Sequence, residues 1–464
     1  MKVVKKMNKS EIKKPTLKIA IIALMTVIAV ILISIRTILV LESALVLGAM
    51  TAAVFALFMG LSWHQIERGM ISGIKNAIGA SLILIIIGMV IGSWILSGTI
   101  QTMIYYGLNF LSPSIFLPAA FILAAITSIL IGSSFGTIAT MGIVLLGVAE
   151  GLGVPKAITV GAIVSGAMLG DKISPMSDST NLTAAMSSTD LFDHIKSMLY
   201  ISVPAALISL ILYSILGASY LDGGANLSQI SIIMDNLSSN FNISLWTLIP
   251  PALMLLLSLF KMPAIASLSI SFITASIFAV LTQGASFAEV LNAAANGYQA
   301  DTGMELLDGL LTQGGINNMM STVAIIMAGT AMGGILEKSR ILEVILESML
   351  TIVKKPRDLI FISLTSAYVM LLATGEMFVS IVIPGRTLAP AYQEMDIDTS
   401  VLSRSLETAS TLGCSILPWG VVSVYIQNVM DIGFSYIPYT FLSFLAPVIA
   451  VIYAFSGKFI FKSK

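Results

Sequence analysis

Apolar segments of roughly membrane-crossing length recur along almost the whole chain. A helix needs about 20 apolar residues to span the hydrocarbon core of a bilayer. Only 10% of the 464 residues are charged, against about 25% in soluble domains, so the sequence predicts an all-α polytopic membrane protein with about 10 to 14 membrane segments. The expected segments are 17–35, 39–60, 77–97, 113–131, 136–150, 157–170, 197–217, 245–260, 264–283, 316–336, 358–374, 376–390, 400–412 and 436–456.

Charge and composition exclude several classes of protein. Basic and acidic residues are equal in number, 24 of each, so no excess positive charge is available for a nucleic-acid partner. The single cysteine, Cys414, excludes an intramolecular disulfide and a paired-cysteine metal site. Two histidines, His64 and His194, are too few for a histidine-rich metal centre. We therefore expect no bound cofactor, and a lipid bilayer as the main partner.

The second half of the chain repeats landmarks of the first. Loop 98–112 carries no charge, whereas its counterpart 337–357 is rich in lysine and arginine. Since positive loops face the cytoplasm, equivalent loops are expected on opposite sides, which predicts two inverted-topology repeats with broken helices. Segments 113–150 and 356–393 then form either re-entrant hairpins or pairs of full spans. A fixed shift of 243 positions pairs Pro113 with Pro356, Gly132 with Gly375, Gly142 with Gly385, Gly170 with Gly413 and Pro175 with Pro418.

The lysines near both ends predict the orientation and the division of the chain. Lysine is abundant before residue 19 and recurs at 458, 462 and 464, so we expect both termini in the cytoplasm. The run 17–35 is long enough for an uncleaved first helix of a multi-pass protein in the cytoplasmic membrane. The expected divisions are a basic segment at 1–16, a first membrane repeat at 17–217, an extracytoplasmic linker at 218–243, a second repeat at 244–458 and a tail at 459–464.

One polar stretch, residues 170–181, interrupts an apolar helix. Pro175 cannot continue the helical hydrogen-bond ladder, so the helix is expected to unwind there and free backbone carbonyls. Oxygen ligands on a broken helix suit a hard cation such as Na⁺. The alternative is a polar loop at the membrane surface in which Asp171 pairs with Lys172. The candidate ligands for a cation or proton are Asp171, Ser174, Ser177, Asp178, Thr180 and Asn181.

Further polar residues at membrane depth form a second tier of candidates. One reading of Arg404 and Glu407 is instead an ion pair that ties helices together. The pattern Gly132-Ser-Ser-Phe-Gly136 also fits a serine hydrolase, but both histidines fall in predicted cytoplasmic loops, so no general base is available and we expect no enzyme. The second-tier candidates are Ser133, Ser134, Thr137, Glu376, Arg404, Glu407, Thr408 and Thr411.

The stretch Gly170-Asp-Lys-Ile-Ser-Pro-Met-Ser-Asp-Ser-Thr-Asn-Leu182 resembles the signature of the NhaC-type Na⁺/H⁺ antiporters. Thr374-Gly-Glu376, Ile383-Pro-Gly-Arg386 and Leu417-Pro-Trp419 resemble the same family in order and spacing. The resemblance implies inverted repeats with hairpins, and the family also includes Na⁺-coupled malate/lactate exchangers. This chain has Thr408 and Gly420 where members of the family commonly have an acid and an asparagine.

These observations lead to the hypothesis of a secondary transporter that exchanges intracellular Na⁺ for external H⁺. Asp171 and Asp178 alternately hold a proton or help to bind Na⁺, and the neighbouring hydroxyl and amide groups supply neutral oxygens. The transported Na⁺ and H⁺ take the place of any cofactor. The alternative is a Na⁺/H⁺-coupled carrier of a small organic anion or amino acid, held by Arg386, Arg404, Lys172 or the backbone amides at the hairpin tips. A homodimer is compatible with either reading.

Overall fold

The computed structural model describes residues 14–38, 40–219, 227–260 and 262–463, and every regular element in these ranges is helical. Nine of the described helices are long and apolar enough to cross a membrane, or up to eleven spans if each bent pair counts as one. The prediction of an all-α polytopic protein is therefore confirmed. The predicted cytoplasmic placement of 1–13, and residues 220–226 of the expected linker, lie outside the described residues.

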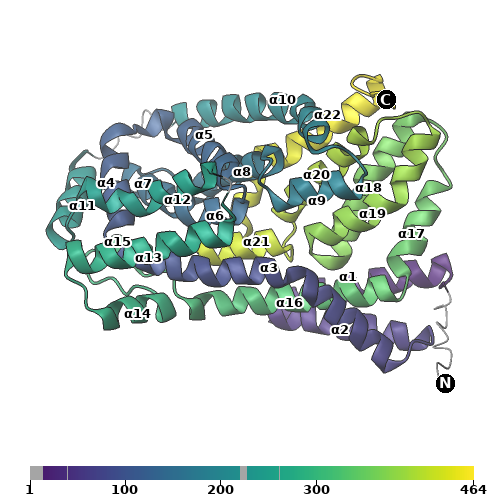
Figure 1. Ribbon diagram of the computed structural model, residues 1–464, viewed down its shortest axis with the longest axis horizontal. Coiled ribbons are helices and arrows are strands. Elements are labelled where there is room, and N and C mark those ends of the chain that lie inside the picture. Colours follow the sequence, from purple (N-terminus) through teal and green to yellow (C-terminus); the bar gives the residue numbers. More distant parts are fainter. Residues whose placement is uncertain (1–13, 39, 220–226, 261, 464) are drawn as a thin grey trace, which may run out of the picture.

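The helices follow one another with short connections (Figure 1). The first half contains α1 (Leu17–Ile38), α2 (Leu41–Phe58), α3 (Trp63–Leu96), α4 (Thr99–Phe110), α5 (Pro113–Ile131), α6 (Ser134–Thr137), the π-helical turn η1 (Ile138–Gly142), α7 (Ile143–Leu152), α8 (Lys156–Ile173), α9 (Asp178–Met186) and α10 (Leu191–Ala218). The second half contains α11 (Leu227–Asn240), the 3-10 turn η2 (Leu245–Leu248), α12 (Ile249–Leu259), α13 (Ala264–Gln283), α14 (Phe287–Asn296), α15 (Glu305–Leu311), α16 (Ile316–Lys338), α17 (Ile341–Leu350), α18 (Pro356–Thr374), α19 (Met377–Glu394), α20 (Thr399–Cys414), α21 (Val421–Val429), the 3-10 turn η3 (Phe434–Tyr439) and α22 (Phe441–Ser456).

The long helices α3 and α16 lie side by side and antiparallel (Figure 1). Gly69 packs against Gly334, Gly73 against Thr330 and Gly88 against Gly315, so contacts advance along one helix as they retreat along the other. A methyl group at Gly73 would overlap the Thr330 carbonyl oxygen. Small residues thus allow backbone-to-backbone contact, as is common between membrane helices.

Two helix pairs turn at a glycine in the left-handed conformation. Gly132 follows the last residue of α5 with a φ of 70°, and Gly375 follows the last residue of α18 with a φ of 69°. Glycine adopts this conformation at no steric cost. The next residue caps the following helix in both cases: Ser133 accepts from the Gly136 N–H and Glu376 from the Val379 N–H. The predicted glycine turns are therefore present.

Each half also contains an interrupted helix. The axis bends by 47° between α8 and α9, and residues 174–177 between them are not helical, so the predicted break at Pro175 is confirmed. In the second half α20 ends at Cys414 and α21 begins at Val421. The bounds of α9 and α21 differ by the same 243 positions that relate the glycines. The opposite membrane orientation of the two halves remains a prediction, which the antiparallel packing of α3 and α16 supports.

One expectation about a loop needs correction. His194 was expected in a cytoplasmic loop, but it lies in α10, fully buried, with its Nδ1 2.8 Å from the Ser403 hydroxyl. The helix begins before the apolar run because Asp190 caps it by accepting from the Phe192 N–H. Within the expected linker 218–243, the structure places the helix α11.

Candidate transport site

The unwound segment between α8 and α9 lies against the glycine turn after α5. A methyl group at Gly132 would come within 2.6 Å of the Met176 Cβ, so only glycine allows this approach. The Ser174 hydroxyl donates to the Ile129 carbonyl oxygen at 2.8 Å and accepts from the Met176 N–H at 3.2 Å. Ser174 thereby holds the turn and the break together rather than facing a ligand. The sequence had placed it among the cation ligands, and its hydroxyl is already occupied here.

Asp171 is the carboxylate that this arrangement buries. It lies in the last turn of α8 with 4% of its surface exposed, and one carboxylate oxygen accepts from Ser134 Oγ and the other from Ser177 Oγ, both at 2.6 Å. Thr180 Oγ1 donates to the Asp171 backbone carbonyl at 3.1 Å. Short hydroxyl bonds to both oxygens fix the carboxylate in one orientation. The glycine turn and the broken helix thus meet at this side chain.

A second buried carboxylate, Glu407, lies close by on α20. Ser179 donates to it at 2.8 Å and Thr411 at 2.9 Å, and Thr183 forms a third, short hydroxyl bond. Ser177 and Ser179 are 3.1 Å apart, oxygen to oxygen. From the Asp171 carboxylate of the first half to the Glu407 carboxylate of the second, the oxygens of Asp171, Ser177, Ser179 and Glu407 therefore follow one another at hydrogen-bonding distance.

Lys172 places a positive charge beside this network. Its side chain is fully buried, and its Nζ donates to Thr408 Oγ1 at 3.2 Å. Among the described residues no carboxylate oxygen lies within 4.0 Å of it. The alternative of a surface loop with an Asp171–Lys172 ion pair is therefore wrong, because both side chains are buried and point to different partners. Proximity in sequence did not determine pairing, since neighbouring helical residues point in different directions.

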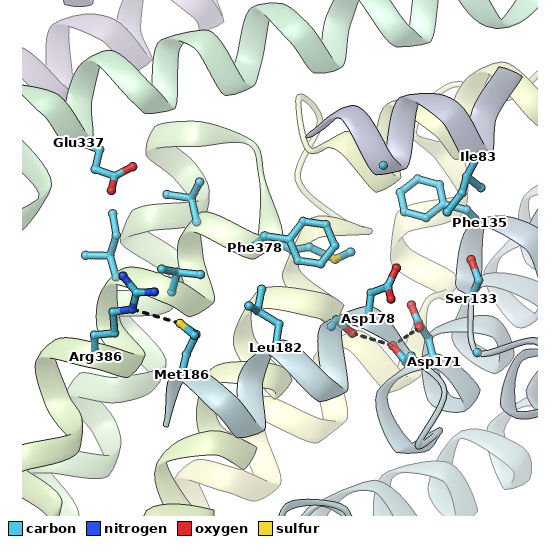
Figure 2. A pocket seen from close by; sticks show the side chains of 18 of the residues that line it. Ile83, Ser133, Phe135, Asp171, Asp178, Leu182, Met186, Glu337, Phe378 and Arg386 are labelled. Carbon is cyan, nitrogen blue, oxygen red and sulfur yellow. Dashed lines mark hydrogen bonds between the residues drawn. The ribbon is translucent and has the colours of Figure 1, made fainter. Parts of the chain in front are cut away.

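The other residues of the 170–181 stretch differ in their surroundings. Asp178 is exposed at the start of α9 and faces the same space as Asp171 (Figure 2). Asn181 donates to the carbonyl oxygens of Pro175 and Ser177, at 2.9 and 2.8 Å, and so stabilises the break. Of the six first-tier residues, the structure brings Asp171, Ser177 and Asp178 to one cavity.

The second-tier residues divide in a similar way. Ser134 reaches Asp171, whereas Ser133 caps α6 and Thr137 donates to the Ser133 carbonyl oxygen. Glu376 is buried and caps α19. These caps orient the glycine turns. Ser134, Glu407 and Thr411 belong to the carboxylate network, and Thr408 accepts from Lys172 beside it.

Arg404 does not pair with Glu407. Its guanidinium donates to the Phe459 carbonyl oxygen at 2.7 Å and lies 5.6 Å from the centre of the Phe461 ring, so it binds the segment after α22. The reading of an Arg404–Glu407 ion pair is therefore wrong: the two side chains leave α20 in different directions. Arg404 still ties separate segments together, but through a backbone carbonyl and an aromatic ring.

A cavity of about 580 Å³ opens beside the carboxylates. Figure 2 shows Asp171 and Asp178 at one end, Leu182 and Phe378 in the middle, and Arg386 and Glu337 at the other end. Its lining comes from both halves of the chain. The lining residues are Ser72, Gly79, Ile83, Gly132, Ser133, Phe135, Asp171, Ser177, Asp178, Ser179, Leu182, Met186, Glu337, Met377, Phe378, Val379, Val382, Ile383 and Arg386.

Sequence reasoning missed Ser179, Thr183 and Glu337. Ser179 and Thr183 are four residues apart, so their hydroxyls share one face of α9 and both reach Glu407. That spacing is a readable signal once α9 is known to be a helix. Glu337 gave no such signal, because its charged neighbours make it look like part of an ordinary polar loop.

A polytopic helical fold with interrupted helices and buried carboxylates beside a cavity defines a secondary membrane transporter. The sequence profile of the Na⁺/H⁺ antiporter family matches residues 4–180 and 166–458. The chain belongs to this family, and it is therefore a transporter rather than an enzyme.

Similar proteins carry antiporter names. The malate-2H⁺/Na⁺-lactate antiporter of Bacillus subtilis is 35% identical over 456 residues, covering 98% of this chain and 97% of that protein. The Na⁺/H⁺ antiporter NhaC of Alkalihalophilus pseudofirmus is 34% identical and the match covers 89% of each chain. The arginine/ornithine antiporter ArcD of Halobacterium salinarum is 34% identical, covering 88% of this chain and 85% of that protein.

Proposed function

We propose that this protein exchanges intracellular Na⁺ for external H⁺ across the cytoplasmic membrane, with both termini in the cytoplasm. The observation that carries the proposal is the Asp171 carboxylate, which is buried at a helix break, bonded by two hydroxyls and adjacent to a cavity. The names of two relatives, a Na⁺/H⁺ antiporter and a malate-2H⁺/Na⁺-lactate antiporter, support Na⁺-coupled exchange.

Competition for one carboxylate is sufficient to couple the two ions. A buried charge is costly unless it is neutralised, so Asp171 holds either a proton or a Na⁺. When Na⁺ binds, Ser134 Oγ and Ser177 Oγ can turn their lone pairs toward it and replace part of its hydration shell. Since one ion displaces the other, each reorientation of the site carries only one of them. Asp178, at the same end of the cavity, attracts the incoming cation.

The hydroxyl run extends this mechanism to Glu407. When Asp171 is protonated and Glu407 is ionised, Asp171 can donate to Ser177, Ser177 to Ser179 and Ser179 to Glu407, since each hydroxyl then accepts one hydrogen bond and donates one. A shift of each proton along its bond moves one proton from Asp171 to Glu407. Glu407 is fully buried and does not line the cavity, so this run is its connection to the transported ions. Lys172 lowers the cost of a charged Glu407 without closing an ion pair.

The test is ²²Na⁺ uptake into proteoliposomes of the purified protein under an imposed pH gradient, with no organic solute present. We expect gradient-driven uptake by the wild type and its loss in Asp171→Asn. Ser410→Ala is the matched control, because Ser410 is a buried hydroxyl on α20 without a hydrogen-bond partner. Normal uptake by Asp171→Asn would remove this carboxylate from the mechanism. No uptake by the wild type would overturn the proposed exchange.

The coupled movement of an organic solute is a second candidate function. The observation in its favour is the cavity itself, which extends beyond the carboxylates to Arg386 and Glu337. Two relatives are named for organic substrates, malate and lactate in one case and arginine and ornithine in the other.

A further inference from the structure

The cavity is larger than a cation site requires. Its volume of about 580 Å³ is in the range of small-molecule pockets, roughly 300–1,000 Å³, and its wall is mostly apolar with a few charged groups. A Na⁺ ion held by Asp171 and its hydroxyls would occupy only one end. The middle, lined by Leu182 and Phe378, offers no ligand for an ion and suits a short carbon chain.

Arg386 supplies an anion-binding group at the other end of the cavity. Its side chain is exposed on α19, and its Nε donates to the Met186 sulfur at 3.2 Å, a weak acceptor. Among the described residues no carboxylate oxygen lies within 4.0 Å of this guanidinium. A guanidinium matches a carboxylate through two parallel hydrogen bonds. Arg386 therefore has donors available for a bound acid.

Glu337 completes this end of the cavity from a different helix. Figure 2 shows its carboxylate directed toward the space in front of Arg386. None of the ion pairs among the described residues joins Glu337 to Arg386, and both side chains line the cavity, so a small polar ligand can lie between them. A carboxylate there accepts hydrogen bonds, and thus favours a ligand that carries a hydroxyl or ammonium donor beside its acid group.

We infer that the Arg386–Glu337 end of the cavity binds a small carboxylic acid with a donor on the neighbouring carbon, that is, a 2-hydroxy or 2-amino acid. Arg386 holds the carboxylate, Glu337 accepts from the donor, and Leu182 and Phe378 contact the carbon chain. The transport of this acid rests on the proposed function, because the cation at Asp171 provides the coupling. Its binding does not, and the two can be measured separately.

The binding experiment uses isothermal titration calorimetry on the purified full chain in detergent. The ligands are lactate, malate, alanine and ornithine, with propionate lacking the donor and lactamide lacking the carboxylate. We expect at least one of the first four to bind and both of the last two to fail. Hydroxy acids that bind without amino acids identify a hydroxyl donor, and the reverse pattern identifies an ammonium donor.

Variants assign the binding to the two charged residues. Arg386→Gln is expected to lower the affinity for the acid by about tenfold or more, because a charge-assisted hydrogen bond is lost. Glu337→Gln should reduce the preference for lactate over propionate, or for alanine over propionate. Lys338→Gln, the neighbour of Glu337 outside the cavity lining, is the matched control and should bind as the wild type does. Equal affinities in Arg386→Gln and Lys338→Gln would overturn the inference.

The two proposals fail in different ways. A wild type that exchanges Na⁺ for H⁺ but binds none of the acids would overturn the acid site and leave the exchange intact. A wild type that binds an acid but shows no pH-driven ²²Na⁺ uptake would overturn the exchange and leave the site. Asp171→Asn, which changes the opposite end, is expected to keep acid binding while it loses Na⁺ uptake.

Discussion

The two interrupted helices have matching geometry and different chemistry. In the first half the carbonyl oxygen of Ile129 is bound by the Ser174 hydroxyl, and at the equivalent position Leu372 is bound by Trp419 Nε1 at 3.1 Å. Gly132 contacts Met176 just as Gly375 contacts Trp419. The same backbone arrangement is thus stabilised twice by different side chains.

What differs is the group placed at the break. Asp171 lies in the last turn of α8, and Cys414, 243 positions later, is the last residue of α20. The first is a carboxylate beside a cavity, whereas the second is a buried thiol 3.6 Å from the Gly375 carbonyl oxygen. The two halves therefore contain the same backbone arrangement of a glycine turn against a helix break. The side chains make the first a candidate ion site, whereas the second is closely packed. The second half still contributes Glu407, from within α20.

The largest expected effect is on Na⁺ uptake, where substitutions of Asp171 and of Cys414 should differ. Asp171→Asn should reduce pH-driven ²²Na⁺ uptake by about 100-fold, because a buried hydrogen-bonded charge at the site is lost. Cys414→Ala should change uptake little, since it removes one sulfur atom from a packed region. The comparison of the two breaks would be wrong if both variants lost activity equally while remaining folded in detergent.

Glu407→Gln tests whether the second half takes part in the chemistry. We expect uptake to fall by about tenfold, because glutamine keeps the shape and two of the acceptor sites but cannot carry the proton. Ser410→Ala, on the same helix, is the control. A pH profile of uptake would distinguish the roles, since loss of a proton-carrying group changes the profile, whereas loss of packing lowers uptake at every pH.

Substitutions of the two turn glycines should lower stability to a similar extent, although the two helix breaks differ in their chemistry. Gly132→Ala and Gly375→Ala each place a methyl group in the left-handed conformation and against a neighbouring residue, at 2.6 and 2.7 Å. We expect each to lower stability by about 1–3 kcal/mol. Thermal unfolding in detergent measures this effect. A lower stability in only one of the two variants would show that the two glycine turns are not structurally equivalent.

The smallest expected effect, on stability, concerns α4 and α17, the helices that precede α5 and α18. The first-half helix α4 is uncharged, whereas Arg340, directly before α17, donates two hydrogen bonds to Glu343 in its first turn, at 2.7 and 2.8 Å. This bond, with help from Lys14, lowers the pKa of Glu343 to about 2 from an ordinary 4.5. A lowered pKa stabilises the fold above pH 4.5, and this contribution disappears as the pH falls toward 2.

Glu343→Gln should therefore reduce stability at pH 7 by no more than about 0.5 kcal/mol, because these groups are partly exposed and solvent screens them. The difference from the wild type should shrink at pH 3. Thermal unfolding at the two pH values measures it. A difference that stays constant with pH would mean that the ion pair is not its source.

Local backbone features were predictable from the sequence, and long-range pairing was not. Pro175, Gly132 and Gly375 determine backbone geometry where they stand, so the break and both turns could be predicted. The bond from Ser179 to Glu407 joins residues 228 positions apart and depends on how α9 packs on α20. The partner of Arg404 could not be predicted for the same reason, because the Phe459 carbonyl oxygen lies after α22, far along the chain. Asp171 was identified because an acid beside a proline break is unusual in an apolar segment.

The contact between α3 and α16 limits which parts of the protein can move. Gly73 and Gly334 bring two backbones together with no side chains between them. Rotamer changes cannot absorb a sliding motion there, and separation of the helices would open a void. An exchanger must nevertheless expose its site to each side of the membrane in turn. The α3–α16 pair is thus expected to stay rigid during the transport cycle. The glycine turns and the helix breaks are the places where the backbone is expected to bend.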